Sequence, residues 1–573
     1  MDSPAADRRS KEGADGVLAG ASSSAQSFVR SCVRSEYRDE LVQLIKLAGP
    51  VFISQLMVFM ISMISVVFCG HLGKTELAGV SLAAAVVNVA GISIGTGLST
   101  TCDTLISQTF GSGNLMRVGV ILQRGVLILL LACFPCWAVL INTESILLAI
   151  KQSPEVASLS QLYVKIFMPA LPAAFMYQLQ GKYLQNQGIM WPQVITGTAG
   201  NVLNAIINYI FLYHLELGVA GSAAANAISQ YLLVLLLHGY ICWRGLHKAT
   251  WGGWSLDCLQ EWGLFMKLAI PSTLMICLPW WLFEMGGFLA SVISEIELGA
   301  QSIAYQLNIV LYTFPLGFSV AATVRVGNAL GAGNTEQAKL SGKIPIICAF
   351  TVACFVGVCI GIGRNVIGYI FTSEQAIILR VGDVMLIFGF LHICDATGGV
   401  IASVLRGAGK QLIGAVCNFV GFYLVGFPLG VYLMFGANMG IVGLWTGLTS
   451  GMSLQTMLFI IFLCKLDWKK ASEEALVRAG VRITEEKETF ELEQSEPNQN
   501  RTRDMAIESK NAEEGGADPD VCGPGQREFT TTTVGAVLSV KELVLWRGLA
   551  FLIMIIILVG GVITSNLLVG SLK

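Results

Sequence analysis

The chain has 573 residues, of which 54% are hydrophobic and only 13% are charged. This balance excludes a soluble globular protein and is typical of a membrane protein with many spans. The formal net charge of −2 gives no electrostatic reason to expect nucleic-acid binding. Most of the 15 cysteines stand inside apolar runs, as Cys69, Cys277 and Cys354 do, so we expect small buried residues rather than a disulfide framework.

The N-terminal residues are mostly polar, so we expect no signal peptide. Twelve apolar runs follow, each long enough to cross a bilayer, since about 20 helical residues span the hydrocarbon. They lie at 47–69, 77–101, 118–142, 159–181, 193–214, 217–242, 268–293, 298–323, 344–372, 379–404, 411–435 and 439–464. A polar, acid-rich stretch comes next, and its low hydrophobicity predicts disorder. A thirteenth run at 548–570 is again long enough to span.

Four sequence anchors recur along the chain at an offset of 220 to 222 residues. The pairs are KLAGP at 46–50 with KLAIP at 267–271, ELAGVSLA at 76–83 with ELGAQSIA at 297–304, GLSTTCDTLISQTFGSGN at 97–114 with GFSVAATVRVGNALGAGN at 317–334, and LGVAG at 217–221 with MGIVG at 439–443. Each repeat holds six spans, an even number, so both copies enter the bilayer in the same sense. This predicts two lobes related by an axis along the membrane normal, with a cavity between them.

We therefore predict an all-α polytopic membrane protein made of two six-helix lobes, a parallel internal repeat, and a C-terminal thirteenth helix. The expected segments are a cytosolic N-terminal segment at 1–42, an N-lobe at 43–245, an interlobe loop at 246–266, a C-lobe at 267–465, a disordered cytosolic tail at 466–543 and a C-terminal transmembrane helix at 544–573.

The placement of lysine and arginine predicts the orientation. Loops after even-numbered spans are richer in these residues, with Arg117, Lys182, Arg325 and Lys410 among them, than loops after odd-numbered spans. By the positive-inside rule the first set is cytosolic. The N-terminus is then cytosolic and the C-terminus extracellular.

One acid stands inside the seventh run, LAIPSTLMICLPWWLFEMGGFLASVI: it is Glu284. A membrane-embedded acid is costly, about 3 kcal/mol or more when charged, and is a functional candidate. Trp280, Trp281 and Phe288 lie within four residues of it, near one helix face. A carboxylate among aromatic rings suits an organic cation and can also exchange protons, so we expect substrate and proton to compete for it. The alternative for the rings is lipid contact or packing.

A second acid, Asp395, stands in the tenth run, and His392 precedes it by three residues on the same helix face. The small residues after Asp395 leave room for a cavity or for close packing. The alternatives are that Asp395 only pairs with His392 or a backbone amide, and that His392 only donates a structural hydrogen bond. The first repeat places no acid at mid-membrane depth.

Several of these segments resemble a known family. CDTLISQTFGSGN, the matching RVGNALGAGN, and ATWGGWSLDCLQEW before the seventh run look like the vertebrate branch of the multidrug and toxin extrusion (MATE) transporters. The resemblance covers about residues 40–470. It implies a plasma-membrane antiporter that expels organic cations in exchange for protons, with a cleft between two six-helix lobes.

The resemblance also implies roles for individual residues. Glu284, Asp395 and His392 match the family's coupling residues, and Gln55 and Asn88 match polar residues of its cavity. Two positions depart from the family, which usually has an acid where Pro279 stands and an acid after the span-eight tyrosine, Tyr305, where this chain has Gln306. Both departures remove negative charge from the expected cleft. Pro279 should also kink the seventh helix and open backbone carbonyls toward the cavity.

The leading hypothesis is thus a proton-coupled exporter of organic cations that works by alternating access. A lipid-linked precursor flippase of the same architecture, or a carrier of this family with altered coupling, is the alternative. A flippase would need several basic residues in the cavity to hold a pyrophosphate, and the spans supply acids instead. A major-facilitator carrier would have a basic G-x-x-x-D-R loop, and SQTFGSGNLMRVG stands in its place.

We expect no enzymatic activity, because the sequence has no nucleophile–base pair. Metal-ligand spacing is also missing, so we expect neither a metal nor another cofactor. The expected partners are small organic cations, protons and the lipid bilayer, with the chain acting as a monomer.

Overall fold

The computed structural model describes residues 6–70, 72–482, 528–529, 534 and 537–572. Thirteen helices in this part of the chain are long and apolar enough to cross a membrane, and they correspond one to one with the thirteen predicted runs. Their bounds are Ser35–Cys69, Thr75–Ser112, Leu115–Leu140, Pro154–Gln185, Trp191–His214, Gly218–Trp243, Trp262–Ile293, Glu295–Gly331, Thr335–Ile370, Gln375–Gly407, Gln411–Gly436, Ile441–Cys464 and Val540–Leu568.

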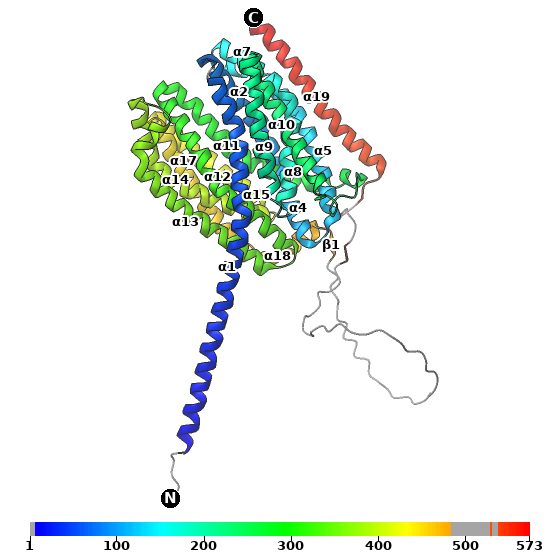
Figure 1. The fold of residues 1–573 in the computed structure, drawn as a ribbon, viewed down its shortest axis with the longest axis vertical. Helices are drawn as coiled ribbons and strands as arrows, with labels where there is room; N and C mark the ends of the chain where they lie inside the picture. The colour runs from blue at the N-terminus through cyan, green and yellow to red at the C-terminus, as the bar shows by residue number, and fades with distance from the viewer. Residues whose placement is uncertain (1–5, 71, 483–527, 530–533, 535–536, 573) are drawn as a thin grey trace, which may run out of the picture.

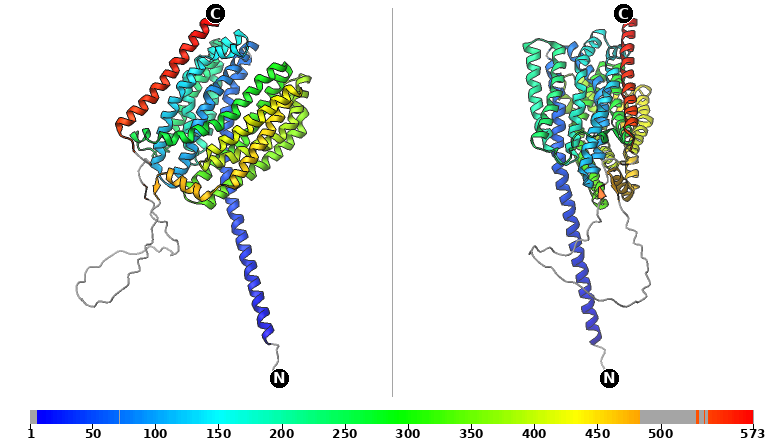
Figure 2. Two further views of the ribbon diagram at one scale, coloured as in Figure 1. Left: turned by 180° about the vertical axis from the view of Figure 1, so that it is seen from behind. Right: turned by 90° about the vertical axis from the view of Figure 1, so that its right-hand side faces the viewer.

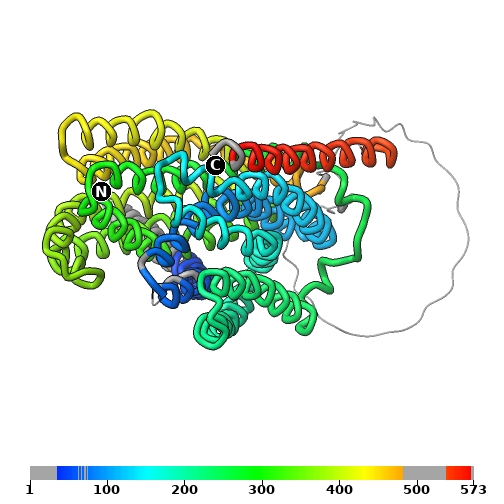
Figure 3. Tube along the Cα trace, turned by 90° about the horizontal axis from the view of Figure 1, so that it is seen from above, coloured from blue at the N-terminus to red at the C-terminus, as the bar shows by residue number. Residues whose placement is uncertain are grey.

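The first twelve spans form two groups of six, seen side by side in Figure 3. The first lobe contains α1 (Ala6–Gly70), α2 (Lys74–Val87), the π-helical η1 (Asn88–Ile92), α3 (Ser93–Ser99), α4 (Thr101–Ser112), α5 (Leu115–Leu140), α6 (Thr143–Ala149), α7 (Pro154–Phe167), η2 (Met168–Ala170), α8 (Leu171–Gln185), α9 (Trp191–Tyr209), η3 (Ile210–His214) and α10 (Gly218–Trp243). The short η4 (Leu256–Leu259) lies in the interlobe loop.

The second lobe contains α11 (Trp262–Ile293), α12 (Glu295–Gly331), α13 (Thr335–Ile367), η5 (Gly368–Ile370), α14 (Gln375–Gly407), α15 (Gln411–Asn418), η6 (Phe419–Gly426), α16 (Phe427–Val431), η7 (Tyr432–Gly436) and α17 (Ile441–Cys464). Each lobe has its own hydrophobic core. The predicted two-lobe architecture is confirmed.

The repeat is visible in local structure as well as in sequence. The anchors GSGN and GAGN each end a helix on a glycine with positive φ, Gly113 at 87° and Gly333 at 80°. Only glycine adopts this backbone conformation without strain. The same chemistry therefore turns the chain at the end of α4 in one lobe and at the end of α12 in the other.

These two turns lie at the same end of the bundle. We call this end, which also holds Arg117, Lys182, Arg325 and Lys410, the basic end, and the opposite one the far end (bottom and top of Figure 1). Helix α1 extends beyond the basic end, so that the expected N-terminal segment continues into the first span as one helix from Ala6 (Figures 1 and 2).

The lobes are in close contact at the basic end. Gly111 lies directly against the backbone of Asn328, and Gly331 against the backbone of Gln108, with no room for a side chain at either glycine. Such small residues let membrane helices approach closely. The amide of Gln108 also donates to the carbonyl of Gly407 at 2.8 Å, and Thr104 donates to the carbonyl of Arg406 at 2.7 Å.

The first residues of the segment predicted to be a disordered tail are ordered. Residues Trp468–Arg478 form helix α18, whose N-cap Asp467 accepts from two backbone amides at 3.1 Å. Strand β1 (Val481–Arg482) pairs antiparallel with β2 (Glu528–Phe529). The rest of the predicted tail up to 527 lies outside the described residues.

The thirteenth span is helix α19 (Val540–Leu572), which lies along α5 on the outside of the first lobe (Figures 1 and 3). Gly561 packs on Ala138, and its carbonyl accepts from the Asn142 amide at 3.0 Å. The rings of Phe134 and Phe551 meet edge to face at 5.7 Å. Helix α19 is thus an addition to the first lobe rather than a part of either repeat.

Candidate functional site

One face of α11 points at the first lobe. Thr273 lies against Gly97 of α3, and the indole of Trp281 donates to the carbonyl of Val89 in η1 at 3.2 Å. Glu284 and Phe288 continue this face at helical spacing toward the far end. Of the interlobe hydrogen bonds in the described chain, the Trp281 bond lies nearest the far end. Glu284 therefore stands on the interlobe face, just beyond the last of these bonds.

The carboxylate of Glu284 is half-buried, and its hydrogen-bond partner is a phenol. Tyr305 of α12 donates its hydroxyl to Oε1 of Glu284 at 3.1 Å. The ring of Tyr305 in turn stacks on Phe283 at 5.9 Å. The ion pairs in the described part of the chain do not involve Glu284 or Asp395. The acid is thus held in place without being neutralised by a basic side chain.

Helix α1 of the first lobe and helix α12 of the second lobe pack against each other across the interlobe boundary. Phe52 stacks on Phe314 with ring centroids 4.4 Å apart. Gln55 follows Phe52 by one turn toward the far end and is half-buried, while Gln306 is two turns beyond Phe314 and exposed. Asn88 is exposed in η1, next to the Val89 carbonyl that Trp281 binds. These three polar side chains lie on helices that border the interlobe region.

Asp395 lies deeper in the second lobe. It is half-buried on α14, within electrostatic range of Tyr312 on α12. The Tyr312 hydroxyl stands 2.7 Å from where a side chain on Gly399 would begin, so the small residues after Asp395 serve close packing here. Tyr305 and Tyr312 are seven residues apart on α12. Asp395 is consequently nearer the basic end than Glu284 by roughly 10 Å, at 1.5 Å per residue.

His392 is buried and faces the interior of the second lobe. Its ring stacks on Phe388 at 6.4 Å, and it borders a narrow gap with Pro315 and Ala353. Its Nδ1 has no hydrogen-bond partner among the residues described. The structure does not join it to Asp395 by a hydrogen bond, although the two are three residues apart.

Trp280 and Phe288 are 40% and 38% exposed, so both rings remain accessible from outside the protein core. Trp281 is more buried because it bridges the two lobes. Among the described residues, two aromatic side chains of the candidate site make a polar contact: Trp281 binds the Val89 carbonyl, and Tyr305 binds Glu284.

The expected opening of backbone carbonyls at Pro279 needs correction. Helix α11 continues through this proline, and the carbonyl of Met275, which loses its backbone donor to the proline, does not open toward the cavity. Asn418 of α15 donates its amide to this carbonyl at 2.8 Å, inside the second lobe. Gln455 in turn donates to Asn418 Oδ1 at 2.5 Å. A side chain therefore replaces the missing backbone donor.

Sequence reasoning missed an aromatic chain that supports Tyr305. Trp445 of α17 is fully buried between Phe283, at 6.0 Å, and Phe388, at 5.6 Å. Its indole donates to Gln301 of α12 at 2.7 Å. This chain packs Tyr305 and His392 into one core, and no spacing within a single span identifies it.

The first lobe holds a buried polar network at about the depth that Glu284 has in the second lobe. Asn226 accepts from Ser65 at 3.0 Å and donates to the hydroxyl of Tyr163 at 2.6 Å. Asn204 donates to Ser229 at 2.9 Å and accepts from Asn208 at 3.1 Å. All six side chains are uncharged, and the hydrogen bonds described for them involve no carboxylate.

Charged residues gather instead at the basic end. Glu261, in the interlobe loop, accepts from Arg117 at 2.9 Å and from Arg124 at 3.0 Å, and all three are buried. Arg117 also donates to the carbonyl of Arg478 in α18 at 3.2 Å. Arg478 donates to Gln108 of α4 at 2.6 Å. Helix α18 is therefore tied to the first lobe although it follows the second.

The same helix is tied to the second lobe through Glu474, which Lys410 contacts at 2.7 Å and Arg478 at 3.0 Å. Burial by itself would raise the pKa of Glu474, but the hydrogen bond and charge of Lys410, together with the charges of Arg478 and Lys470, outweigh it. The net effect lowers the pKa of this carboxyl below its usual value.

Comparison with known proteins agrees with this architecture. The MatE family model matches residues 50–210 and 271–432, one segment in each lobe. Multidrug and toxin extrusion protein 1 of Danio rerio is 62% identical over 98% of this chain and 97% of its own length. The protein of the same name from Homo sapiens is 54% identical over 79% of this chain and 80% of its own length.

Solved structures share the fold. The eukaryotic MATE transporter AtDTX14 superposes with a TM-score of 0.75 at 29% identity, covering 78% of this chain and all of that one. The Vibrio cholerae MATE transporter VcmN in its bent form superposes with a TM-score of 0.66 at 16% identity, covering 78% of this chain and 99% of that one, which shows the fold alone. The relatives bear the names of extrusion proteins and transporters, not of enzymes. The chain is a multi-pass membrane protein of the multidrug and toxin extrusion (MATE) family.

Proposed function

We propose that this chain is an exporter of organic cations that exchanges them for protons by alternating access between its two lobes. The observation that carries the proposal is the position of Glu284. It stands inside a membrane span, on the interlobe face of α11, with a phenol rather than a basic side chain as its partner. Such a carboxylate is costly unless a cation or a proton occupies it.

The chemistry of the gap favours a cationic passenger. Glu284 supplies the charge, and Trp280, Trp281 and Phe288 supply aromatic faces for cation–π contact. When a proton arrives from the acidic side, it neutralises Glu284 and removes the charge attraction, so the cation leaves. Loss of the proton on the other side restores the site for loading.

Asp395 supplies a second proton-binding carboxylate nearer the basic end, and Tyr312 lies beside it. His392 borders the same core through its stack on Phe388. Gln55, Asn88, Tyr305 and Gln306 offer neutral polar contacts to the passenger. With Gln306 and Pro279 in place of acids, we expect coupling to depend on these two carboxylates alone.

The orientation follows from the charges at the two ends. The basic end faces the cytosol of a cell whose plasma membrane holds the protein, so the N-terminus is cytosolic and the C-terminus extracellular. The close interlobe contacts at the basic end then close the cytosolic side, which corresponds to an outward-facing state. The chain works as a monomer, since each copy holds both lobes.

A lipid-linked precursor flippase is the alternative function. It would need unpaired basic residues around the gap to hold a pyrophosphate. Arg117, Arg124, Lys182 and Arg325 are instead paired with acids at the basic end. The charge in the gap favours the cation exporter.

The test uses the purified chain in vesicles loaded with tetraethylammonium under an outward-acidic gradient. We expect Glu284→Gln to reduce efflux at least roughly 10-fold, the loss expected for about 1.4 kcal/mol of charge attraction. The matched control is Glu295→Gln, at an exposed glutamate of the same lobe, which should leave efflux unchanged. Efflux that persists in the Glu284 variant would overturn the assigned role.

A further inference from the structure

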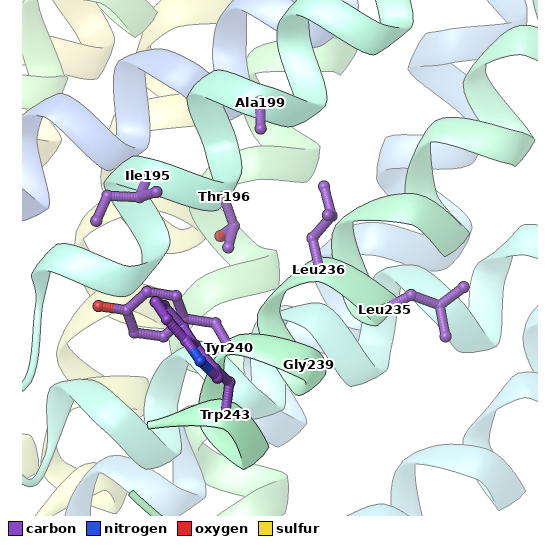
Figure 4. A pocket seen from close by; sticks show the side chains of 8 residues that line it. All are labelled: Ile195, Thr196, Ala199, Leu235, Leu236, Gly239, Tyr240 and Trp243. Carbon is purple, nitrogen blue, oxygen red and sulfur yellow. The ribbon is translucent and has the colours of Figure 1, made fainter. Parts of the chain in front are cut away.

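A groove of about 360 Å³ runs along the outside of the first lobe between α9 and α10 (Figure 4). Its lining residues come from these two helices and include neither Glu284 nor Asp395. Its walls are almost entirely apolar and include Ile195, Ala199, Leu235, Gly239, Tyr240 and Trp243. The hydroxyl of Thr196, which also lines it, is already used, since it donates to the carbonyl of Pro192 at 2.8 Å.

The groove exists because of a glycine. A side chain built on Gly239 would begin in open space, with no atom within 4 Å. Leu235 and Trp243 lie one helical turn before and after Gly239 on α10. Their side chains are 63% and 78% exposed and form the two edges of the groove. Both helices are membrane spans, so the groove opens to the bilayer rather than to water.

Two positive charges stand at the mouth of the groove. The guanidinium of Arg244 lies 5.9 Å from the ring of Trp243. Lys248 folds back over Gly245, with its Nζ 3.6 Å from where a side chain on Gly245 would begin. Both cations are exposed, and the ion pairs of the described chain include neither.

The surroundings of these cations contain no opposing acid on the two helices. Neither α9 nor α10 carries an aspartate or glutamate. Trp191, at the start of α9, is 59% exposed and stands at the same end as Trp243. Exposed tryptophans at one end of neighbouring spans mark the level of the lipid headgroups. The apolar groove thus ends in a basic mouth at headgroup depth.

We propose that this groove binds an anionic glycerophospholipid of the surrounding bilayer. One acyl chain lies along Gly239 between the two edges, and the phosphate lies between Arg244 and Lys248. The span from Leu235 to Trp243 is roughly 12 Å along the helix, enough for a stretch of acyl chain below the headgroup. A neutral lipid fills the same groove but gains nothing from the two cations, which attract an anionic headgroup.

The experiment measures which lipids the intact chain retains. The purified full-length protein is equilibrated with an equimolar mixture of dioleoyl-phosphatidylglycerol and dioleoyl-phosphatidylcholine, and retained lipids are counted by native mass spectrometry. We expect the wild-type chain to retain phosphatidylglycerol in preference by roughly 30-fold, since each of the two cations favours an anionic headgroup by about fivefold. Equal retention of the two lipids would overturn the proposal.

Two variants separate the groove from its mouth. Gly239→Leu fills the groove without a clash and should abolish retention, whereas Gly560→Leu, also in open space on the membrane helix α19, should not. Arg244→Gln with Lys248→Gln should leave a lipid bound but remove the preference for phosphatidylglycerol; Lys469→Gln, at an exposed lysine of α18, is the charge control. Unchanged retention in Gly239→Leu, in protein with a wild-type elution profile, would also overturn the proposal.

Discussion

The two lobes share one topology but differ in the chemistry of their polar interiors. In the first lobe, amides and hydroxyls around Asn226 bond to one another and involve no carboxylate among the residues described. In the second lobe, Glu284 and Asp395 are held near tyrosines of α12. The two lobes therefore share a scaffold, while the embedded acids Glu284 and Asp395, which have no basic partner among the described residues, stand in the second lobe. Amides and hydroxyls do not take up protons near neutral pH, so we expect proton coupling to depend on the acids of the second lobe.

The largest effect should come from removing both acids of the second lobe. Glu284→Gln with Asp395→Asn should reduce proton-driven tetraethylammonium flux at least roughly 30-fold, because neither of the two membrane-embedded carboxylates proposed to bind cation or proton remains. The control pair is Glu295→Gln with Glu374→Gln, two exposed acids of the same lobe. If the flux of the Glu284→Gln, Asp395→Asn variant kept the pH dependence of the wild type, other residues would have to carry the coupling.

The network of the first lobe should affect stability instead of coupling. Asn226→Ala leaves Ser65, Tyr163 and Asn204 without a shared partner in a buried site. We expect a loss of about 1–2 kcal/mol and a lower thermal unfolding midpoint in detergent. The pH dependence of transport per folded molecule should stay that of the wild type, and a shift in it would show that this lobe takes part in proton coupling.

A third difference is the proline of α11, since Val58 stands at the corresponding position of the first repeat. Asn418→Leu leaves the carbonyl of Met275 without a donor and should destabilise the protein by about 1 kcal/mol. Pro279→Ala restores a backbone N–H, so the loss should shrink in the double variant. A double-mutant cycle on unfolding midpoints measures this coupling, and additive effects would contradict it.

The smallest effect concerns the contact that joins the lobes through α18. Because the pKa of Glu474 is lowered in the folded protein, its contribution is present above the ordinary value of 4.5 and is lost as the pH falls below it. Glu474→Gln should therefore speed hydrogen exchange in α18 by less than about threefold at pH 7, since the pair is partly exposed. The difference between the variant and the wild type should shrink as the pH falls below 4.5, and a difference that stays constant would contradict this origin.

The sequence was sufficient for the spans and the repeat, because apolar runs and recurring anchors are readable directly, and it singled out Glu284 as an acid inside a span. It did not predict the bond from Asn418 to Met275, because the two residues are 143 positions apart and meet only through packing. The network around Asn226 was not predicted for a related reason: single neutral polar residues in different spans form no pattern in the sequence. Helix α18 was not predicted because its sequence is short and polar, and contacts of Glu474 and Arg478 with the two lobes hold it.

The most direct test of the central claim is the number of protons released when the protein binds a cation. Calorimetry of tetraethylammonium binding in two buffers of different ionisation enthalpy gives this number. We expect proton release by the wild type and by Asn226→Ala, and none by Glu284→Gln with Asp395→Asn. Proton release that survives in the double variant, or disappears in Asn226→Ala, would contradict the assignment of coupling to the second lobe.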